Sequence, residues 1–263
     1  MCKIISIINQ KGGVGKTTTC INLAVSLTQL GKKVLAIDLD SQANLTMGMG
    51  VDYANPDELP LKLADLLYEE ISKRRGQKVD AVAHKDYILT AHGVDFIPSS
   101  LDLAGLELEL MNATSRESVL KSVLDQFRAS YDFILIDCLP SLGIFTVNAL
   151  TASDEIIIPV QAQYFGAKGV EALMQSVSSV QTYLNSNLKV LGILITMIDG
   201  RSKFQREVGE IVQSNYSDTT KIFTATIPLS VEVSRQQSQG LPIVAIKNNK
   251  VSEAYSEFAK EVL

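Results

Sequence analysis

The stretch that decides the fold is Lys11-Gly12-Gly13-Val14-Gly15-Lys16-Thr17-Thr18. An apolar run at residues 4–8 precedes it and predicts a strand, and the leucines that follow at helical spacing predict a helix. A glycine-rich loop between a strand and a helix points successive backbone N–H groups into one concavity, where the helix dipole adds positive potential. The sequence therefore predicts a phosphate-binding loop, with Lys16 on the β- and γ-phosphates of a nucleotide and the Thr17 hydroxyl on Mg²⁺.

Short apolar runs alternate with amphipathic runs along the rest of the chain, which is the βαβ rhythm of a parallel sheet. The short runs are rich in Ile, Val and Leu without polar alternation, as expected of strands that are buried on both faces. We therefore expect an α/β fold, a twisted parallel-stranded sheet with helices on both faces. The expected strands are Ile4–Ile8, Val34–Asp38, Val94–Pro98, Phe133–Asp137, Ile156–Val160, Val190–Thr196 and Ile222–Ile227.

Aspartates follow two of these strands at the edge of the sheet where the loop is expected. Asp38 and Asp40 end one strand, and Asp137 ends another. The carboxyl ends of parallel strands are where such sheets gather their functional groups. An apolar strand that ends in aspartate is typical of the carboxylate that holds Mg²⁺ directly or through water. Ser41 and Asn44 suit helix capping better than Asp40 does.

Composition narrows the class of protein. The 263 residues are 46% hydrophobic and 20% charged, which suits a globular protein with a large core, and we expect one domain over residues 1–263 with an irregular surface excursion near 51–92. The net charge of −5 excludes a surface that is basic throughout, although a local basic patch remains open. Three scattered cysteines and two histidines indicate a reduced cytoplasmic protein without disulfides or zinc. We find no leader and no apolar run of the ~20 residues that a spanning helix needs.

The loop departs from the pattern G-x-x-x-x-G-K-[ST] because Gln10 stands at the first glycine position and Lys11 adds a second lysine. In this it resembles the deviant Walker A motif of the MinD/ParA/nitrogenase iron protein group of P-loop nucleoside triphosphatases. The resemblance implies hydrolysis of ATP to ADP and phosphate with Mg²⁺, slowly and under stimulation by a partner.

The same resemblance implies a role for each site residue. Lys11 would reach the nucleotide of the partner subunit in an ATP-bound homodimer, Asp40 would orient or activate the attacking water, and Asp38 would support Asp40. The implied catalytic residues are Lys11, Lys16 and Asp40, the implied metal site is Thr17, Asp40 and Asp137, and the implied nucleotide contacts are Lys11, Gly12, Gly13, Val14, Gly15, Lys16, Thr17, Thr18 and Pro228.

Later segments are similar to the ParA/Soj partition ATPases, namely residues 97–104, 137–143, 196–201, 227–228 and 240–243. This similarity implies an ATP-dependent sandwich dimer that associates with the nucleoid by binding duplex DNA without sequence preference. It also implies a ParB-like centromere-binding partner and segregation of a plasmid, chromosome or mobile element. Where the family commonly has two arginines, Leu229 and Glu232 stand instead. The implied DNA contacts are Arg201, Lys203, Arg206, Arg235, Lys247 and Lys250.

The group leaves an alternative open, a ParA/MinD-like ATPase that positions a protein cargo or acts at the membrane. A membrane-bound member needs a basic amphipathic tail. The C-terminal segment instead carries Glu253, Glu257 and Glu261 around an apolar face, which favours a helix packed on the core and no membrane contact. A nitrogenase-iron-protein-like electron carrier needs two cluster cysteines per subunit, and the cysteines here suit small buried side chains better.

Overall fold

A computed structural model describes residues 2–51, 58–79, 82–161, 166–199 and 220–263. In this part of the chain one sheet has the strand order β3-β4-β2-β5-β1-β6-β7, and every strand pair is parallel except β3 with β4. The predicted α/β fold is confirmed. The strands are β1 Lys3–Ile7, β2 Val34–Leu39, β3 Leu89–Ala91, β4 Val94–Ile97, β5 Phe133–Cys138, β6 Glu155–Gln161 and β7 Lys189–Thr196.

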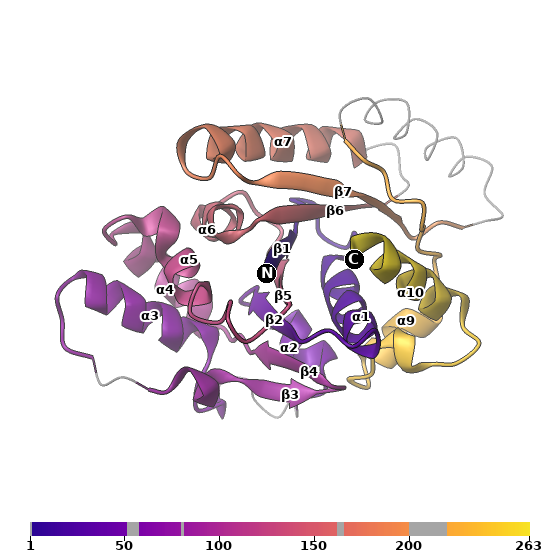
Figure 1. Cartoon of the computed structure of the whole chain (residues 1–263), viewed down its shortest axis with the longest axis horizontal. Helices are drawn as coiled ribbons and strands as arrows, with labels where there is room; N and C mark the ends of the chain where they lie inside the picture. Colours follow the sequence, from indigo (N-terminus) through magenta and orange to yellow (C-terminus); the bar gives the residue numbers. More distant parts are fainter. Residues whose placement is uncertain (1, 52–57, 80–81, 162–165, 200–219) are drawn as a thin grey trace.

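Helices cover both faces of the sheet, as Figure 1 shows. In the described part of the chain, the two large clusters of buried apolar side chains lie one between each face and its helices. On one face lie α1 Lys16–Gln29, α2 Asn44–Gly48, α9 Val231–Gln237 and α10 Lys250–Val262. On the other lie α3 Leu63–Arg74, α4 Asp102–Met111, α5 Val119–Leu124, α6 Ile144–Ala152 and α7 Gly166–Tyr183.

Two details of the sheet differ from the prediction. Residues Ile222–Ile227 do not form a strand, since the segment makes one isolated bridge, that of Ile222 with Ile193. The Glu261 carboxylate of α10 accepts the backbone N–H groups of Thr224 and Ala225, at 2.9 and 2.7 Å. Phe223 N and Ile227 N donate to Ile193 O and Ile195 O of β7, so the loss of Ala225 N between them interrupts the ladder.

The second difference is β3, which the sequence did not reveal. It pairs antiparallel with β4 through a tight hairpin whose turn residues are His92 and Gly93, with φ of 52° and 78°. Two consecutive left-handed residues are the geometry of a short hairpin turn. The glycine was therefore the available signal, but a strand of only three residues leaves little periodicity to detect.

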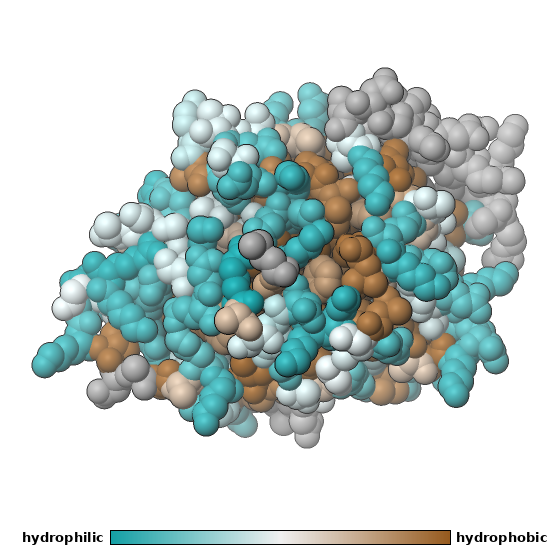
Figure 2. All heavy atoms as spheres, in the orientation of Figure 1, coloured by the Kyte–Doolittle hydropathy of each residue, from teal (hydrophilic) through white to brown (hydrophobic). Residues whose placement is uncertain are grey.

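The C-terminal helix α10 packs on the core as predicted. Val251, Tyr255, Phe258 and Val262 are each 2% exposed or less, while the glutamates face outward or cap neighbouring backbone. The side of the molecule shown in Figure 2 is mostly hydrophilic, with apolar side chains gathered in smaller groups. Among the described helices, none combines the length and apolar character needed to cross a membrane. The three cysteines are buried free thiols, as expected of small core side chains.

Candidate functional site

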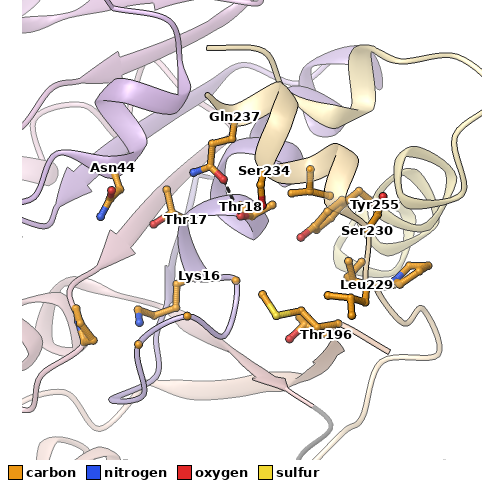
Figure 3. Close-up of a pocket in the computed structure, with 18 of the residues that line it drawn as sticks. Lys16, Thr17, Thr18, Asn44, Thr196, Leu229, Ser230, Ser234, Gln237 and Tyr255 are labelled. Atoms are coloured by element: carbon orange, nitrogen blue, oxygen red, sulfur yellow. Dashed lines mark hydrogen bonds between the residues drawn. The ribbon is translucent and has the colours of Figure 1, made fainter. Parts of the chain in front are cut away.

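A pocket of about 360 Å³ lies at the carboxyl edge of the sheet. The loop after β1 forms its floor, Asp40 and Asn44 after β2 form one wall, and the segment from Ile227 into α9 forms the opposite wall. Figure 3 shows Lys16 and Thr17 on one side of the pocket and α9 above Thr18. The topology therefore gathers loops that are far apart in sequence around one cavity.

The loop after β1 has the backbone geometry of an anion cradle. Gly13 and Gly15 have φ of 71° and 88°, a backbone conformation that residues with a side chain rarely adopt. A Cβ on Gly12 or Gly13 would meet no atom within 4 Å, so this side of the loop is open. The first hydrogen bond of α1 runs from Thr19 N to Gly15 O at 2.9 Å, which leaves the N–H groups of the first turn without intrahelical acceptors. Val14, one of the implied nucleotide contacts, is buried and is not among the described residues that line the pocket.

Two residues that the sequence analysis did not select hold this loop in place. Asn9, which is 2% exposed, donates Nδ2 to Pro159 O at 2.8 Å and accepts Lys11 N on Oδ1 at 3.0 Å. The Thr196 hydroxyl at the end of β7 donates to Val14 O at 2.9 Å. The loop is thus fastened to the two strands beyond β1 on one side of the sheet. Their adjacency to the predicted loop and strand end was the only sequence signal for either residue.

Lys16 begins α1 and is 7% exposed, and its Nζ donates to Lys11 O at 3.0 Å. Burial lowers the pKa of Lys16, while the negative groups beside it, Asp137 foremost, oppose that change. The Lys16 side chain therefore reaches back to the start of the loop, where its ammonium group binds the loop backbone. The partly exposed Lys11 is not among the described residues that line the pocket.

The aspartates form a buried acidic layer next to the loop. Asp38 and Asp137 are register partners on β2 and β5, and they are 0% and 1% exposed. Asp38 accepts Thr46 N at 2.8 Å, Thr46 Oγ1 at 2.7 Å and Asp40 N at 3.2 Å. Burial raises the pKa of Asp38 to about 6 in spite of these bonds.

Asp137 lacks such support. Neither of its carboxylate oxygens makes a hydrogen bond of normal geometry to any described residue. Burial raises the pKa of Asp137, the Asp38 carboxylate adds to the rise, and the Thr17 hydroxyl and Lys16 ammonium oppose it. A buried carboxylate without donors requires a cation or a proton. Asp40 differs, because it is 8% exposed and lines the pocket, and among the described residues its carboxylate accepts only Gln42 N, at 3.0 Å, through Oδ1.

The wall opposite Asp40 comes from the C-terminal part of the chain. Pro228, an implied nucleotide contact, lines the pocket, and Ser230, two residues later, caps α9 by accepting Glu232 N at 3.2 Å. Gln237 at the end of α9 accepts the Thr18 hydroxyl on Oε1 at 3.3 Å, the contact drawn in Figure 3. No motif or periodicity in the sequence had singled out Ser230 or Gln237.

Three of the six implied DNA contacts fall on described residues. Arg235 is exposed on α9, with its guanidinium 3.7 Å from the Glu232 carboxylate, and Lys247 and Lys250 are exposed before and at the start of α10. Arg201, Lys203 and Arg206 lie outside the described residues. The structure thus places two of these basic groups, Arg235 on α9 and Lys250 on α10, on helices that also line the pocket, and the DNA contacts stay a prediction.

Known proteins resemble this chain over its full length. Residues 2–190 match a family model described as an AAA domain. The sporulation initiation inhibitor protein Soj of Bacillus subtilis is 40% identical over 263 residues, which is 100% of this chain and 98% of the relative. The chromosome partitioning protein ParA of Caulobacter vibrioides is 37% identical over 264 residues, covering 99% of this chain and 94% of the relative.

A solved structure carries a nucleotide on the same fold. It is described as cobyrinic acid a,c-diamide synthase from Mycobacterium smegmatis with bound ADP and magnesium. This structure superposes with a TM-score of 0.80 at 32% identity, and the match covers 99% of this chain and 93% of the other. The partitioning relatives are the more similar in sequence.

Proposed function

Because the chain belongs to the ParA/Soj family of chromosome-partitioning ATPases, we propose that it binds Mg-ATP in the pocket above residues 11–18 and hydrolyses it slowly, under stimulation by a partner. The observation that carries this proposal is the buried carboxylate of Asp137, which makes no hydrogen bond of normal geometry to the described residues and has the Thr17 hydroxyl and Lys16 ammonium beside it. Mg²⁺ is the hard cation that such oxygen ligands suit.

The residues present fit a nucleotide with its metal. The N–H groups of the first turn of α1 and the open faces of Gly12 and Gly13 would receive phosphate oxygens. Lys16 would exchange its bond to Lys11 O for the β- and γ-phosphates. Thr17, Asp40 and Asp137 would hold the metal directly or through water. When bound, Mg²⁺ supplies positive charge that neutralises the phosphates during transfer to water.

Asp40 is the group best placed to act on the attacking water. It lines the pocket, and one of its oxygens keeps the bond to Gln42 N, which orients the carboxylate. A carboxylate at this place could accept a proton or align a water molecule. Asp38 would assist by holding Asp40 N and the start of α2, where it binds Thr46.

Lys11 supports the proposed ATP-dependent sandwich dimer. Its backbone is anchored by Asn9, while its side chain is partly exposed and does not line the pocket of its own chain. A lysine in this position has a clear role if a second subunit closes over the pocket and Lys11 neutralises charge on that subunit's nucleotide. Nucleotide would then control the association of two chains.

We extend the proposal to segregation of a plasmid, chromosome or mobile element. The dimer would bind duplex DNA without sequence preference, which places it on the nucleoid in the cytoplasm, and a ParB-like partner would stimulate hydrolysis and release. The support is the match over the full chain to Soj and ParA. The packing of α10 on the core gives no support to the membrane alternative.

The test is a titration of duplex DNA at two salt concentrations with ATP, with ADP and without nucleotide. Two subunits brought together contact twice as many phosphates, and each neutralised phosphate adds roughly 0.9 to the slope of log affinity against log salt. We expect tight, salt-sensitive binding of DNA with ATP but not with ADP or without nucleotide. Sedimentation should likewise show the dimer only with ATP. Lys11→Ala should bind nucleotide but form no dimer.

Equal DNA binding in all nucleotide states, or none in any, would contradict the segregation proposal. If the ATP-dependent dimer persists in that case, a protein cargo becomes the better account. If Lys11→Ala dimerises normally with ATP, then Lys11 acts within its own loop.

A further inference from the structure

The contact between Thr18 and Gln237 joins two parts of the pocket that are 219 residues apart in sequence. Thr18 lies in the first turn of α1, and Gln237 is the last residue of α9. Within the described residues, no other hydrogen bond connects α9 to α1. The contact therefore ties the helix that carries Arg235 to the phosphate loop.

Gln237 also touches the segment that follows Asp40. A Cβ built on Gly48 in α2 would lie 3.5 Å from Gln237 Cγ and 3.6 Å from Nε2, so the side chain packs directly on this glycine. Asn44 at the start of α2 lines the main pocket, and a second open hollow of about 390 Å³ lies between α2 and α9. Gln237 thus lies where the phosphate loop, α2 and α9 meet.

The Thr18 hydroxyl has one proton to donate, and the structure directs it to Gln237 Oε1. A phosphate oxygen of a nucleotide on the loop is a second and stronger acceptor for that proton. A glutamine can serve either arrangement, because rotation of its amide by half a turn replaces the acceptor Oε1 with the donor Nε2. Thr18 Oγ1 has lone pairs to accept that donor.

We propose that Gln237 is a positioning residue whose hydrogen bond to Thr18 reverses direction. Without nucleotide, Gln237 Oε1 accepts a hydrogen bond from the Thr18 hydroxyl. When that hydroxyl donates to a phosphate oxygen instead, Gln237 Nε2 donates to Thr18 Oγ1. This inference rests on the proposed binding of nucleotide at the loop. Its consequence is that α9, with the pocket residues Val233 and Ser234 and the exposed Arg235, stays bonded to the phosphate loop in both arrangements and moves with it.

Two variants separate the switching role from a merely structural tie. Gln237→Met keeps the length of the side chain and loses both hydrogen-bond roles. Gln237→Glu keeps the acceptor but has no donor when ionised, so it satisfies only the first arrangement. Gln239→Glu is the matched control, because it makes the same change at an exposed position outside the pocket.

The experiment measures the affinity of each variant for fluorescent ADP and for a non-hydrolysable ATP analogue, and the melting temperature with and without nucleotide. We expect Gln237→Met to bind about 3- to 10-fold more weakly, the effect of one hydrogen bond. Gln237→Glu should keep the melting temperature of the wild type without nucleotide, yet bind at least about tenfold more weakly. Gln239→Glu should match the wild type in both measurements.

Hydrogen exchange gives a second readout of the same proposal. Nucleotide should slow exchange in residues 231–237 of the wild type and the control, and this protection should be reduced in Gln237→Met. If Gln237→Glu binds nucleotide as well as the control does, then a fixed acceptor is sufficient and the switching role is wrong. If the wild type binds neither nucleotide, the proposed function itself is wrong. If all variants bind nucleotide normally, only the role of Gln237 is wrong.

Discussion

Replacement of Asn9 by alanine is the sharpest test of how the fold prepares the phosphate loop. Asn9 bridges Pro159 O on β6 and Lys11 N in the loop, at 2.8 and 3.0 Å. Each bond contributes about 1 kcal/mol net, and the buried Pro159 carbonyl would lose its Asn9 donor at a further cost of about 1–2 kcal/mol. The free energy of unfolding should therefore fall by about 3–4 kcal/mol. Loss of the loop-side bond should weaken nucleotide binding about fivefold, since 1 kcal/mol of preorganisation is lost.

Asn148 provides a matched control for this change. It is equally buried, at 1% exposed, and its amide likewise accepts a backbone N–H, from Leu120, and donates to backbone carbonyls, those of Arg116 and Ile144. It lies on α6, away from the pocket. Asn148→Ala should lose a similar free energy of unfolding in urea denaturation and keep its affinity for fluorescent ADP. Equal nucleotide affinities for the two variants, both measured where the protein is fully folded, would refute the role assigned to Asn9.

Three further predictions concern charged groups of the site. Lys16→Ala should abolish nucleotide binding while the chain stays folded, because the buried ammonium is the cation of the loop; tight binding of ATP in a titration would remove that assignment. Asp40→Ala should bind ATP and dimerise but release phosphate poorly, and wild-type turnover would move the role in orienting water elsewhere. Burial raises the pKa of Asp38 to about 6, against about 3.9 in an unfolded chain. Folding therefore favours the protonated carboxyl, and its contribution, about 3 kcal/mol, is present below pH ~4 and lost as pH rises through ~6. Urea denaturation of metal-free protein between pH 4 and 7 should show a shallower fall in Asp38→Asn, and identical pH profiles would contradict the predicted shift.

The amino-acid sequence was sufficient for those features whose cause is local. Six strands follow from apolar runs, because burial on both faces of a parallel sheet leaves a continuous pattern in the chain. The glycines of residues 12–15 predict the loop, because the left-handed backbone at Gly13 and Gly15 favours glycine. The placement of Asp40 on the pocket also followed, since the ends of parallel strands meet at one edge, whereas Pro228 was implied only by the family resemblance.

The segment at 222–227 marks the limit of that approach. Its apolar and β-branched residues fit a strand, yet Glu261 takes the backbone donors of Thr224 and Ala225. A carboxylate on a helix 36 or 37 residues away leaves no trace in the local pattern. The strand preference and apolar character of residues 222–227 therefore predicted a strand that tertiary hydrogen bonds prevented.

Only the tertiary structure decided which side chains support the site. Asn9 bonds to Pro159 across 150 residues, Thr196 to Val14 across 182, and Thr18 to Gln237 across 219. Each is a common polar residue whose type suits a solvated surface as well as a buried contact. What makes it functional is a partner within about 3 Å, and that proximity depends on the order in which the strands assemble in the sheet. The sequence predicted the chemistry of the pocket because phosphate and metal binding need particular residue types. The residues that hold the pocket in place need only a suitable neighbour in space, which the sequence does not show.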